Sequence, residues 1–309
     1  MRILMVGAGA TGGFYGGKLV QAGRDVTFLL REGRARQIRD GGLQILPHHG
    51  DPITVHPKIV TAADLRTHPQ TFDLIVISTK AYQLAGAMDD IAPVLAPGTL
   101  LLPILNGMQQ LAILDERFGA EIVLGGSVRI VSDLDEAGRI HQMNALDQMS
   151  YGERSGERTQ RILAVDAEMR DAGFEAILQP DIIDALWQKW VILASMGAIC
   201  ILARGNAGQV AVAPRGPEFA QAVVAECAAI ATANGYPPDA ALLAAHTRRM
   251  VEPGSTLTSS MYRDMTKGAP VEADHILGDL LDRAGGIAAP LLTAAYVQLK
   301  VYEAGRNAA

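Results

Sequence analysis

Residues 7–12 are Gly7-Ala8-Gly9-Ala10-Thr11-Gly12, and they join a short apolar run, 2–6, to a helical pattern. The run before the glycines predicts a buried parallel strand. A strand, Gly-x-Gly-x-x-Gly and a helix in this order form the context in which the motif binds a dinucleotide. Gly7 permits a tight turn, Gly9 lets a pyrophosphate approach the backbone, and Gly12 lets the helix pack close to the sheet. The helix N-terminus then offers N–H groups to the phosphates. A glycine-rich turn that binds nothing is the alternative.

The second predicted strand, 25–30, ends at Arg31. Folds that bind NAD usually carry Asp or Glu at this strand end to hold the ribose 2′-hydroxyl. Here the strand ends in Leu30-Arg31, with Arg34 and Arg36 close behind. A guanidinium suits the 2′-phosphate of NADP because it binds phosphate with two parallel hydrogen bonds. Glu32 could serve a ribose if the strand ended one residue later, and the arginines could form a solvated helix face. We expect NADP rather than NAD.

Composition limits the class of protein. The chain has 309 residues, which favours two domains, and 49% of them are hydrophobic, enough to bury a sizeable core. The net charge is −6 and no basic tract occurs, which argues against nucleic acid as a partner. Cys200 and Cys227 lie in apolar stretches and are expected to be buried thiols in a reducing compartment. His48 and His49 lack a third ligand at suitable spacing, so we predict no metal site.

The longest apolar run, 190–203, lies between Lys189 and Arg204. It is too short to span a bilayer and predicts a buried core helix. The first core strand begins by residue 3, which leaves no room for a targeting segment. We therefore expect a cytoplasmic protein with no membrane partner.

The order of patterns predicts the fold class. Strands are expected at 72–79, ending at Lys80, and at 99–105, ending at Asn106. Ligands of open α/β sheets bind beyond such carboxyl ends. Residues 122–131 should continue the sheet, while 43–46 with 53–56, and 138–143 with 148–151, suggest antiparallel additions. After about residue 180 only helical patterns occur. We predict an α/β Rossmann-type NADP-binding domain, 1–179, with a mostly parallel sheet and antiparallel additions, followed by an all-α substrate and catalytic domain, 180–309.

Taken together, these features resemble the 2-dehydropantoate 2-reductase (ketopantoate reductase) family, over nearly the full length. Each motif is weak alone, but six in the same order are specific for the family. They are the glycine motif, Arg31, Ser78-Thr79-Lys80-Ala81-Tyr82-Gln83, Asn106-Gly107-Met108, Leu186-Trp187-Gln188-Lys189, and Ser259-Ser260-Met261-Tyr262-Arg263-Asp264 with Glu272 beyond it.

The resemblance implies an oxidoreductase that uses NADPH to reduce a small 2-keto acid to a 2-hydroxy acid, ketopantoate to pantoate in pantothenate biosynthesis. It implies Lys189 as the general acid, with Glu272 as a catalytic-site acid that holds a substrate hydroxyl. It further implies that Ser260 binds the substrate carboxylate and that Asn106 orients nicotinamide or substrate. The implied cofactor-binding residues are Gly7, Ala8, Gly9, Ala10, Thr11, Gly12, Arg31, Lys80, Gln83 and Asn106.

Each of these residues also has a plain structural interpretation. Lys189 could be a surface lysine on a core helix, and Glu272 an acid in the first turn after Pro270. Ser260 could cap a helix, and Asn106 could belong to an Asn-Gly turn. The alanine-rich helices at 220–233 and 240–245 could pack within the domain or across a homodimer.

The chain departs from the family pattern at three positions. Members often carry asparagines where this chain has Leu193, Gly197 and Leu257. Leu193 and Gly197 share the helix face of Lys189. Because polar groups are missing there, a bulkier or less polar ketone becomes an alternative substrate. Two further hypotheses remain: a dehydrogenase of β-hydroxy acids on the same scaffold, and a non-catalytic sensor of NADP(H).

Overall fold

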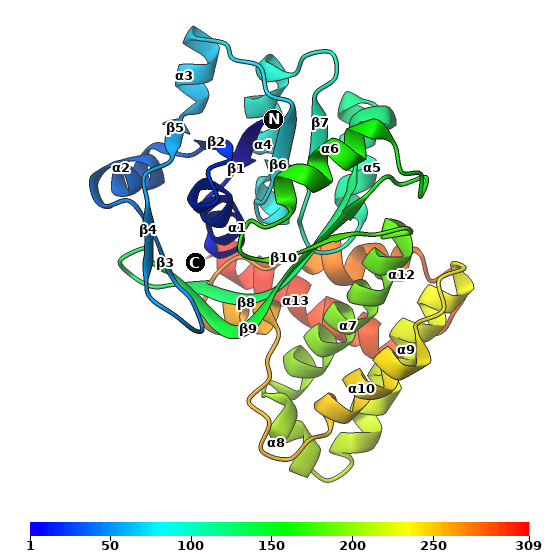
Figure 1. The fold of residues 1–309 in the computed structure, drawn as a ribbon. Helices are drawn as coiled ribbons and strands as arrows, with labels where there is room; N and C mark the ends of the chain where they lie inside the picture. The colour runs from blue at the N-terminus through cyan, green and yellow to red at the C-terminus, as the bar shows by residue number, and fades with distance from the viewer. Residues whose placement is uncertain (309) are drawn as a thin grey trace. The chain divides into compact units, whose positions relative to one another are not determined.

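The computed structural model describes residues 1–308, which divide into two compact units (Figure 1). Unit 1 comprises Met1–Leu105 and Gln110–Ile183, and unit 2 comprises Asn106–Gln109 and Asp184–Ala309. Unit 1 is the α/β part and unit 2 is helical, which confirms the predicted fold class.

The first sheet of unit 1 is entirely parallel and has the strand order β5-β2-β1-β6-β7. Met5 of the central strand is in register with Phe28 on one side and Val76 on the other. Almost every residue of these two neighbouring strands and of β1 is buried, as expected for a parallel sheet covered on both faces. The strands are β1 (Arg2–Val6), β2 (Asp25–Leu29), β5 (Lys58–Val60), β6 (Leu74–Ile77) and β7 (Leu100–Pro103).

The second sheet of unit 1 has the order β10-β9-β3-β4, and β8 also pairs with β9. The predicted hairpin at 43–46 and 53–56 forms its antiparallel β3–β4 pair. The strands are β3 (Leu43–Leu46), β4 (Ile53–Val55), β8 (Gly125–Leu134), β9 (Ile140–Gly152) and β10 (Glu175–Leu178).

Two predictions about this region were wrong in detail. Residues 122–131 do not continue the parallel sheet: only Val123 bridges to Leu101, and the chain then enters the second sheet as β8. Residues 138–143 and 148–151 are not two paired strands but parts of the single strand β9. Residues 144–147 do not end the strand, because an irregularity in the β8 pairing, between Ile130 and Ser132, accommodates them.

Helix α1 (Ala10–Gln21) packs against strands of both sheets. Its glycines explain how the helix fits there. A Cβ at Gly16 would overlap the ring of Phe28 in the first sheet. A Cβ at Gly13 would lie 2.5 Å from Ile140 Cδ1, and one at Gly17 would lie 2.7 Å from Ile45 Cδ1, both in the second sheet. The missing side chains therefore let two sheets approach one helix closely.

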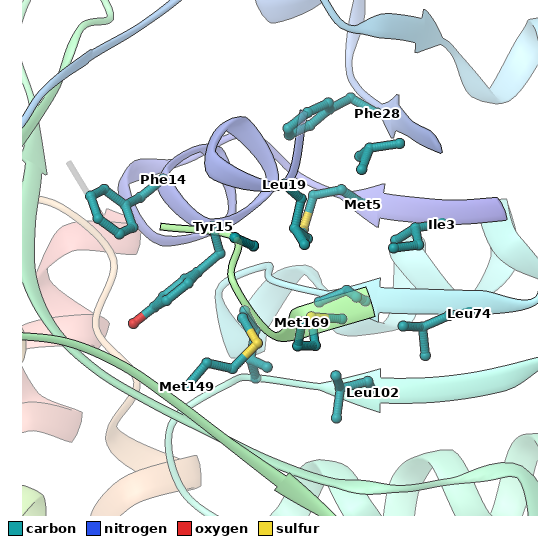
Figure 2. Packing of buried hydrophobic residues seen from close by; sticks show 14 of the residues in the cluster. Ile3, Met5, Phe14, Tyr15, Leu19, Phe28, Leu74, Leu102, Met149 and Met169 are labelled. Atoms are coloured by element: carbon teal, nitrogen blue, oxygen red, sulfur yellow. The ribbon is translucent and has the colours of Figure 1, made fainter. Parts of the chain in front are cut away.

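The core of unit 1 fills the space around α1 (Figure 2). Figure 2 shows Phe14, Tyr15 and Leu19 from the helix gathered with side chains of the strands. The hydroxyl of Tyr15 donates to the carbonyl of Gln148 at 2.9 Å, and burial raises the pKa of this phenol. The polar end of a buried ring is thereby satisfied, as buried tyrosines require.

The remaining helices of unit 1 are α2 (Glu32–Gly41), α3 (Ala62–Thr67), α4 (Leu84–Ile91), α5 (Gln109–Phe118) and α6 (Gln160–Met169), with short turns η1 (Ala81–Gln83), η2 (Ala92–Val94) and η3 (Ala120–Ile122). Helix α3 has a capping box: Thr61 accepts from the backbone of Asp64, whose carboxylate accepts from the backbone of Thr61.

Unit 2 is built around the long helix α7 (Ile182–Ala203). This is the one helix in residues 1–308 that is long and apolar enough to cross a membrane, and 61% of its apolar window is buried, as in a core helix. The other elements are α8 (Ala207–Val212), α9 (Gly216–Ala233), α10 (Ala240–Met250), α11 (Ser260–Thr266), the π-helical turn η4 (Asp274–Gly278), α12 (Asp279–Asp282) and α13 (Pro290–Ala308).

The predicted helix from Pro270 begins four residues late, at Asp274, and opens as a π-helical turn. The short helix α8 has no predicted counterpart, whereas α11 begins at Ser260, where a capped helix was one interpretation of the sequence. Each begins at a side-chain cap, Asn206 for α8 and Ser259 for α11, and each is too short for a periodic pattern to stand out.

A buried polar pair joins α7 to α10. Ser195 Oγ lies 2.6 Å from the carbonyl of Val191 and 2.8 Å from His246 Nε2. Because the hydroxyl has one hydrogen to donate and gives it to Val191, we assign the proton to His246 Nε2, which donates to Ser195. Burial, and secondarily the charge of Arg249, lowers the pKa of His246 to about 4.

This pair predicts a loss of stability in acid. Between pH 6.5 and about 4 an unfolded chain protonates His246 whereas the folded chain does not, so the stabilisation present above pH 6.5 declines as the pH falls. The loss from this group should reach about 3 kcal/mol. Urea unfolding of the wild type and His246→Asn should therefore show a stability difference at pH 7.5 that shrinks by about that amount at pH 4.5. An equal difference at both pH values would contradict the assignment.

Candidate active site

The glycine-rich loop in unit 1 has the shape that a dinucleotide needs. Gly7 has φ +96°, and its N–H donates to the carbonyl of Leu29 at 3.1 Å. A Cβ at Gly12 would lie 2.5 Å from the carbonyl oxygen of Gly7, so only glycine permits this close packing. By contrast, nothing lies within 4 Å of a Cβ built on Gly9, which leaves open space at that point of the backbone.

The surroundings of the loop also fit a phosphate-bearing group. Gly9 is the N-cap of α1 and provides no side-chain cap, so the first N–H groups of the helix point toward the open space. The hydroxyl Oγ1 of Thr79, at the end of β6 beside Gly7, is buried and has no hydrogen-bond partner among residues 1–308. A ligand with acceptor oxygens would satisfy these donors.

The other predicted cofactor residues follow the neighbouring strands. Arg31 is exposed and lies at the N-cap of α2, directly after β2 and Leu30. Lys80 lies after β6 as the N-cap of η1, and the side-chain oxygen of Gln83 accepts from its backbone N–H at 3.4 Å. The structure thus gives Gln83 a capping role. Arg31, Lys80 and the glycine loop all lie at the carboxyl edge of the parallel sheet, the usual edge for ligands.

In unit 2, the structure brings Lys189 and Asn106 together. The Nζ of Lys189 on α7 donates to Oδ1 of Asn106 at 3.0 Å, although 83 residues separate the two in sequence. An ammonium has three N–H donors in rotatable positions, so it can bind this amide and a ligand oxygen together. A cation fixed by a neutral acceptor is suited to stabilise negative charge that develops on an oxygen.

Backbone packing holds both members of this pair. Gly107, next to Asn106, has φ +82°, and a Cβ there would overlap the carbonyl oxygen of His275 in the π-helical turn. The indole Nε1 of Trp190, next to Lys189, donates to the carbonyl of Ile276 in the same turn at 2.9 Å. The turn η4 therefore contacts the immediate neighbours of both polar residues, and π-helical turns of this kind are frequent at functional sites.

Two further predicted site residues lie in unit 2. Glu272 is buried, two residues before η4, and its charge opposes the lowering of the pKa that burial imposes on His275. Ser260 is the first residue of α11. The cap of that helix is Ser259, whose Oγ accepts from the N–H of Tyr262 at 3.0 Å, so Ser260 is not the capping serine.

Within residues 1–308 no group of three or more His, Cys, Asp or Glu side chains could hold a metal ion. Cys200 and Cys227 are buried, and burial raises the pKa of both thiols. They are therefore poor nucleophiles.

Comparison with known families identifies the fold and its class of chemistry. Residues 3–156 match the family model described as "Ketopantoate reductase PanE/ApbA", and residues 181–303 match "Ketopantoate reductase PanE/ApbA C terminal". The chain belongs to the ketopantoate reductase family. It is accordingly an oxidoreductase, and its family supports nucleotide-dependent reduction of 2-keto acids.

Three similar proteins match this chain along nearly their whole lengths. An uncharacterized oxidoreductase, YkpB of Bacillus subtilis, is 35% identical over 98% of this chain and 99% of its own. The crystal structure of 2-dehydropantoate 2-reductase from Geobacter metallireducens is 27% identical, with a TM-score of 0.87 over 97% of this chain and 99% of its own. A D-mandelate dehydrogenase with NADH and anilino(oxo)acetate shares the fold at 22% identity, with a TM-score of 0.86 over 99% and 100%.

Sequence reasoning missed several residues that shape these sites. No role was predicted for Trp190 or His275. Trp190 contacts a carbonyl 86 residues away, and His275 acts through its own backbone carbonyl, so no local sequence pattern reveals either contact. Arg34 was considered only as an arginine near the end of β2. In the structure its Nε donates to the carbonyl of Ala8 in the glycine loop at 3.0 Å.

The position of Gly107 gives a test of the Asn106 site. Gly107→Ala must both adopt a left-handed φ and displace the carbonyl of His275, so it should destabilise the protein by roughly 1–3 kcal/mol and lower turnover. The matched control is Gly254→Ala, which has φ +79° but nothing within 4 Å of a Cβ. Gly254→Ala should lower the thermal unfolding temperature because of the strained backbone, but turnover should stay at the wild-type level. Equal turnover losses in the two variants would contradict a role for close packing at Gly107.

Proposed function

We propose that this protein uses NADPH to reduce the ketone of a 2-keto acid to the 2-hydroxy acid, with ketopantoate as first candidate substrate and pantoate as product. The observation that carries the proposal is the Lys189–Asn106 hydrogen bond of 3.0 Å in a chain of the ketopantoate reductase family. Lys189 is proposed as the general acid and Asn106 as the residue that orients it. Glu272 and Ser260 are proposed to bind the substrate's hydroxyl and carboxylate.

Reduction of a ketone to an alcohol needs a proton donor at the ketone oxygen. NADPH, held by the glycine loop and Arg31, would supply a hydride to C2 of the keto acid. As the C–H bond forms, the carbon–oxygen π electrons move to oxygen and build an alkoxide. The Lys189 ammonium stabilises this charge and then transfers a proton to the oxygen, which completes the hydroxyl. The neutral amine recovers its proton from water. The hydrogen bond to Asn106 would keep Nζ in position throughout. Because an amide is a very weak base, Asn106 would not take the proton in place of the substrate.

Preference for NADPH rests on Arg31. It is exposed directly after β2, and no acidic residue precedes it at the strand end. A free guanidinium suits a 2′-phosphate, whereas Glu32 lies in the first turn of α2, where an acid also favours the helix dipole. Lys80 lies at the same edge of the sheet and is proposed as a second cation for the phosphate-bearing cofactor.

A second candidate substrate is a 2-keto acid with an apolar side chain. Ile192, Leu193 and Met196 follow Lys189 at spacings that place them on its helix face, and all three are partly exposed. A Cβ at Gly197 would lie 2.9 Å from Cε of Met261, so this face continues as an aliphatic surface. The D-mandelate dehydrogenase that shares the fold is named for an aromatic hydroxy acid, which supports this candidate.

Lys189→Ala tests the catalytic assignment. Loss of a general acid should lower kcat by about 10²–10⁴-fold, while the dissociation constant of NADPH changes little. Lys189→Arg is the matched control for charge, because a guanidinium keeps the positive charge but does not release a proton near neutral pH. It should recover only a small part of the rate. Turnover of Lys189→Ala at the wild-type rate would refute the assignment and favour a sensor.

A substrate panel distinguishes the two candidates. The values of kcat/KM for ketopantoate and for phenylglyoxylate should differ, and Leu193→Asn should shift their ratio toward ketopantoate by roughly tenfold, since one pocket contact is worth about that much. Leu202→Asn is the comparison for simple loss of apolar surface, because Leu202 is also partly exposed on α7 but lies on a different face from Lys189. A ratio that Leu193→Asn leaves unchanged would exclude this position from the substrate pocket.

A further inference from the structure

Arg34 joins three segments of unit 1 through hydrogen bonds to backbone carbonyls. From helix α2, its Nε donates to the carbonyl of Ala8 in the glycine loop at 3.0 Å. Its Nη1 donates to the carbonyl of Gly138, in the turn between β8 and β9, at 2.8 Å. Gln37, one turn further along α2, accepts from Arg34 Nη1 at 2.6 Å and donates to the carbonyl of Ala137 at 2.6 Å. We call this set the Arg34 clamp.

The β8–β9 turn, whose carbonyls accept hydrogen bonds from the Arg34 clamp, is held by hydrogen bonds of its own. Gly138 has φ +74°, and its N–H donates to the carbonyl of Asp135 at 2.9 Å. A Cβ at Gly138 would overlap both Arg34 Nη1 and the Gln37 amide, so the clamp requires glycine here. Asp135 binds Arg139 and His141, which hold the pKa of its carboxyl well below the usual range. The turn is thus fixed independently of Arg34.

The clamp withdraws a cation from water without pairing it to an anion. Burial lowers the pKa of Arg34, and its Nη2 is buried with no hydrogen-bond partner in residues 1–308. No carboxylate pairs with Arg34 in the same residues, and its acceptors are carbonyls and one amide. Burying an unpaired charge is unfavourable. A purely structural role in holding α2 in place therefore does not explain why an arginine stands at position 34.

The contact with Ala8 acts on the phosphate-binding loop. Because a trans peptide is planar, fixing the Ala8 carbonyl toward Arg34 turns the N–H of Gly9 the opposite way. Gly9 is the N-cap of α1 and lies in the open part of the loop. A loop that is already oriented loses less conformational freedom when it binds, and the guanidinium adds positive charge beside it.

We propose that Arg34 is a positioning residue for the dinucleotide: it orients the glycine-rich loop and ties it to the β8–β9 turn, and so strengthens binding of the cofactor's pyrophosphate. This rests on the proposed function, in which the loop binds NADPH. Because pyrophosphate is common to both dinucleotides, Arg34 should act on NADPH and NADH alike. Arg31, which is proposed to meet the 2′-phosphate, should act on NADPH alone.

The test measures dissociation constants of NADPH and NADH by fluorescence titration, with kcat at saturating cofactor. Arg34→Ala should raise both dissociation constants by the same factor, about tenfold, and leave kcat within about twofold. Gly138→Ala should weaken both cofactors in the same way, and the double variant should be no weaker than Arg34→Ala alone, because both changes break one clamp. Arg158→Ala is the control for simple loss of a positive charge, since Arg158 is exposed in unit 1 and its side chain has no hydrogen bond or ion pair in the described residues; it should leave both dissociation constants unchanged.

The outcomes separate this proposal from the proposed function. If the wild type binds neither dinucleotide, the proposed function fails and the positioning role fails with it. If the wild type binds but Arg34→Ala keeps both dissociation constants within twofold, only the positioning role is overturned. A loss confined to NADPH would also overturn it, because that result makes Arg34 a direct contact of the 2′-phosphate. Additive losses in the double variant would show that Gly138 and Arg34 act separately.

Discussion

The close approach of two sheets to one helix is the constraint on which unit 1 depends. Helix α1 lacks side chains at Gly13, Gly16 and Gly17, and bulky residues of both sheets occupy those positions instead. The helix is therefore fixed on two sides, and so is the glycine loop at its N-terminus. The second sheet also carries the β8–β9 turn, whose carbonyl at Gly138 meets α2 through Arg34. Gly13, Gly16 and Gly17 thus set the packing of the unit, while Gly7 and Gly12 shape the loop from which α1 starts.

Unit 2 places its polar pair by a different means. Lys189 lies on the long helix α7, and Asn106 belongs to a four-residue segment, Asn106–Gln109, inserted from the unit 1 part of the sequence. The π-helical turn contacts the neighbours of both residues through the carbonyls of His275 and Ile276. A π-helical turn displaces carbonyls from the regular helical pattern and makes them available to such partners. The irregular start of the helix predicted from Pro270 is therefore part of how the pair is held.

Much of this could be predicted from the sequence, and the failures have physical causes. The glycine motif, the parallel strands and α7 carry strong local patterns, so their positions were predictable. Residues 125–131 were predicted to extend the first sheet but belong to β8 of the second, because a strand pattern does not say which sheet it joins. Residues 138–143 and 148–151 were predicted as separate strands because the sequence does not show that an irregular pairing can carry the residues between them within one strand. The roles of Trp190, His275 and Arg34 depend on backbone carbonyls far away in sequence, and no residue pattern records those.

In the proposed reaction, a hydride passes from a nicotinamide to C2 of a keto acid while Lys189 supplies the proton. The most direct measurement incubates the protein with NADPH that carries deuterium at the transferable C4 position and with the keto acid, and follows the label by mass spectrometry and NMR. The expected product is a 2-hydroxy acid with one deuterium on C2. A product without deuterium at C2, or bound cofactor that keeps its label in the presence of every keto acid offered, would contradict the proposed reaction.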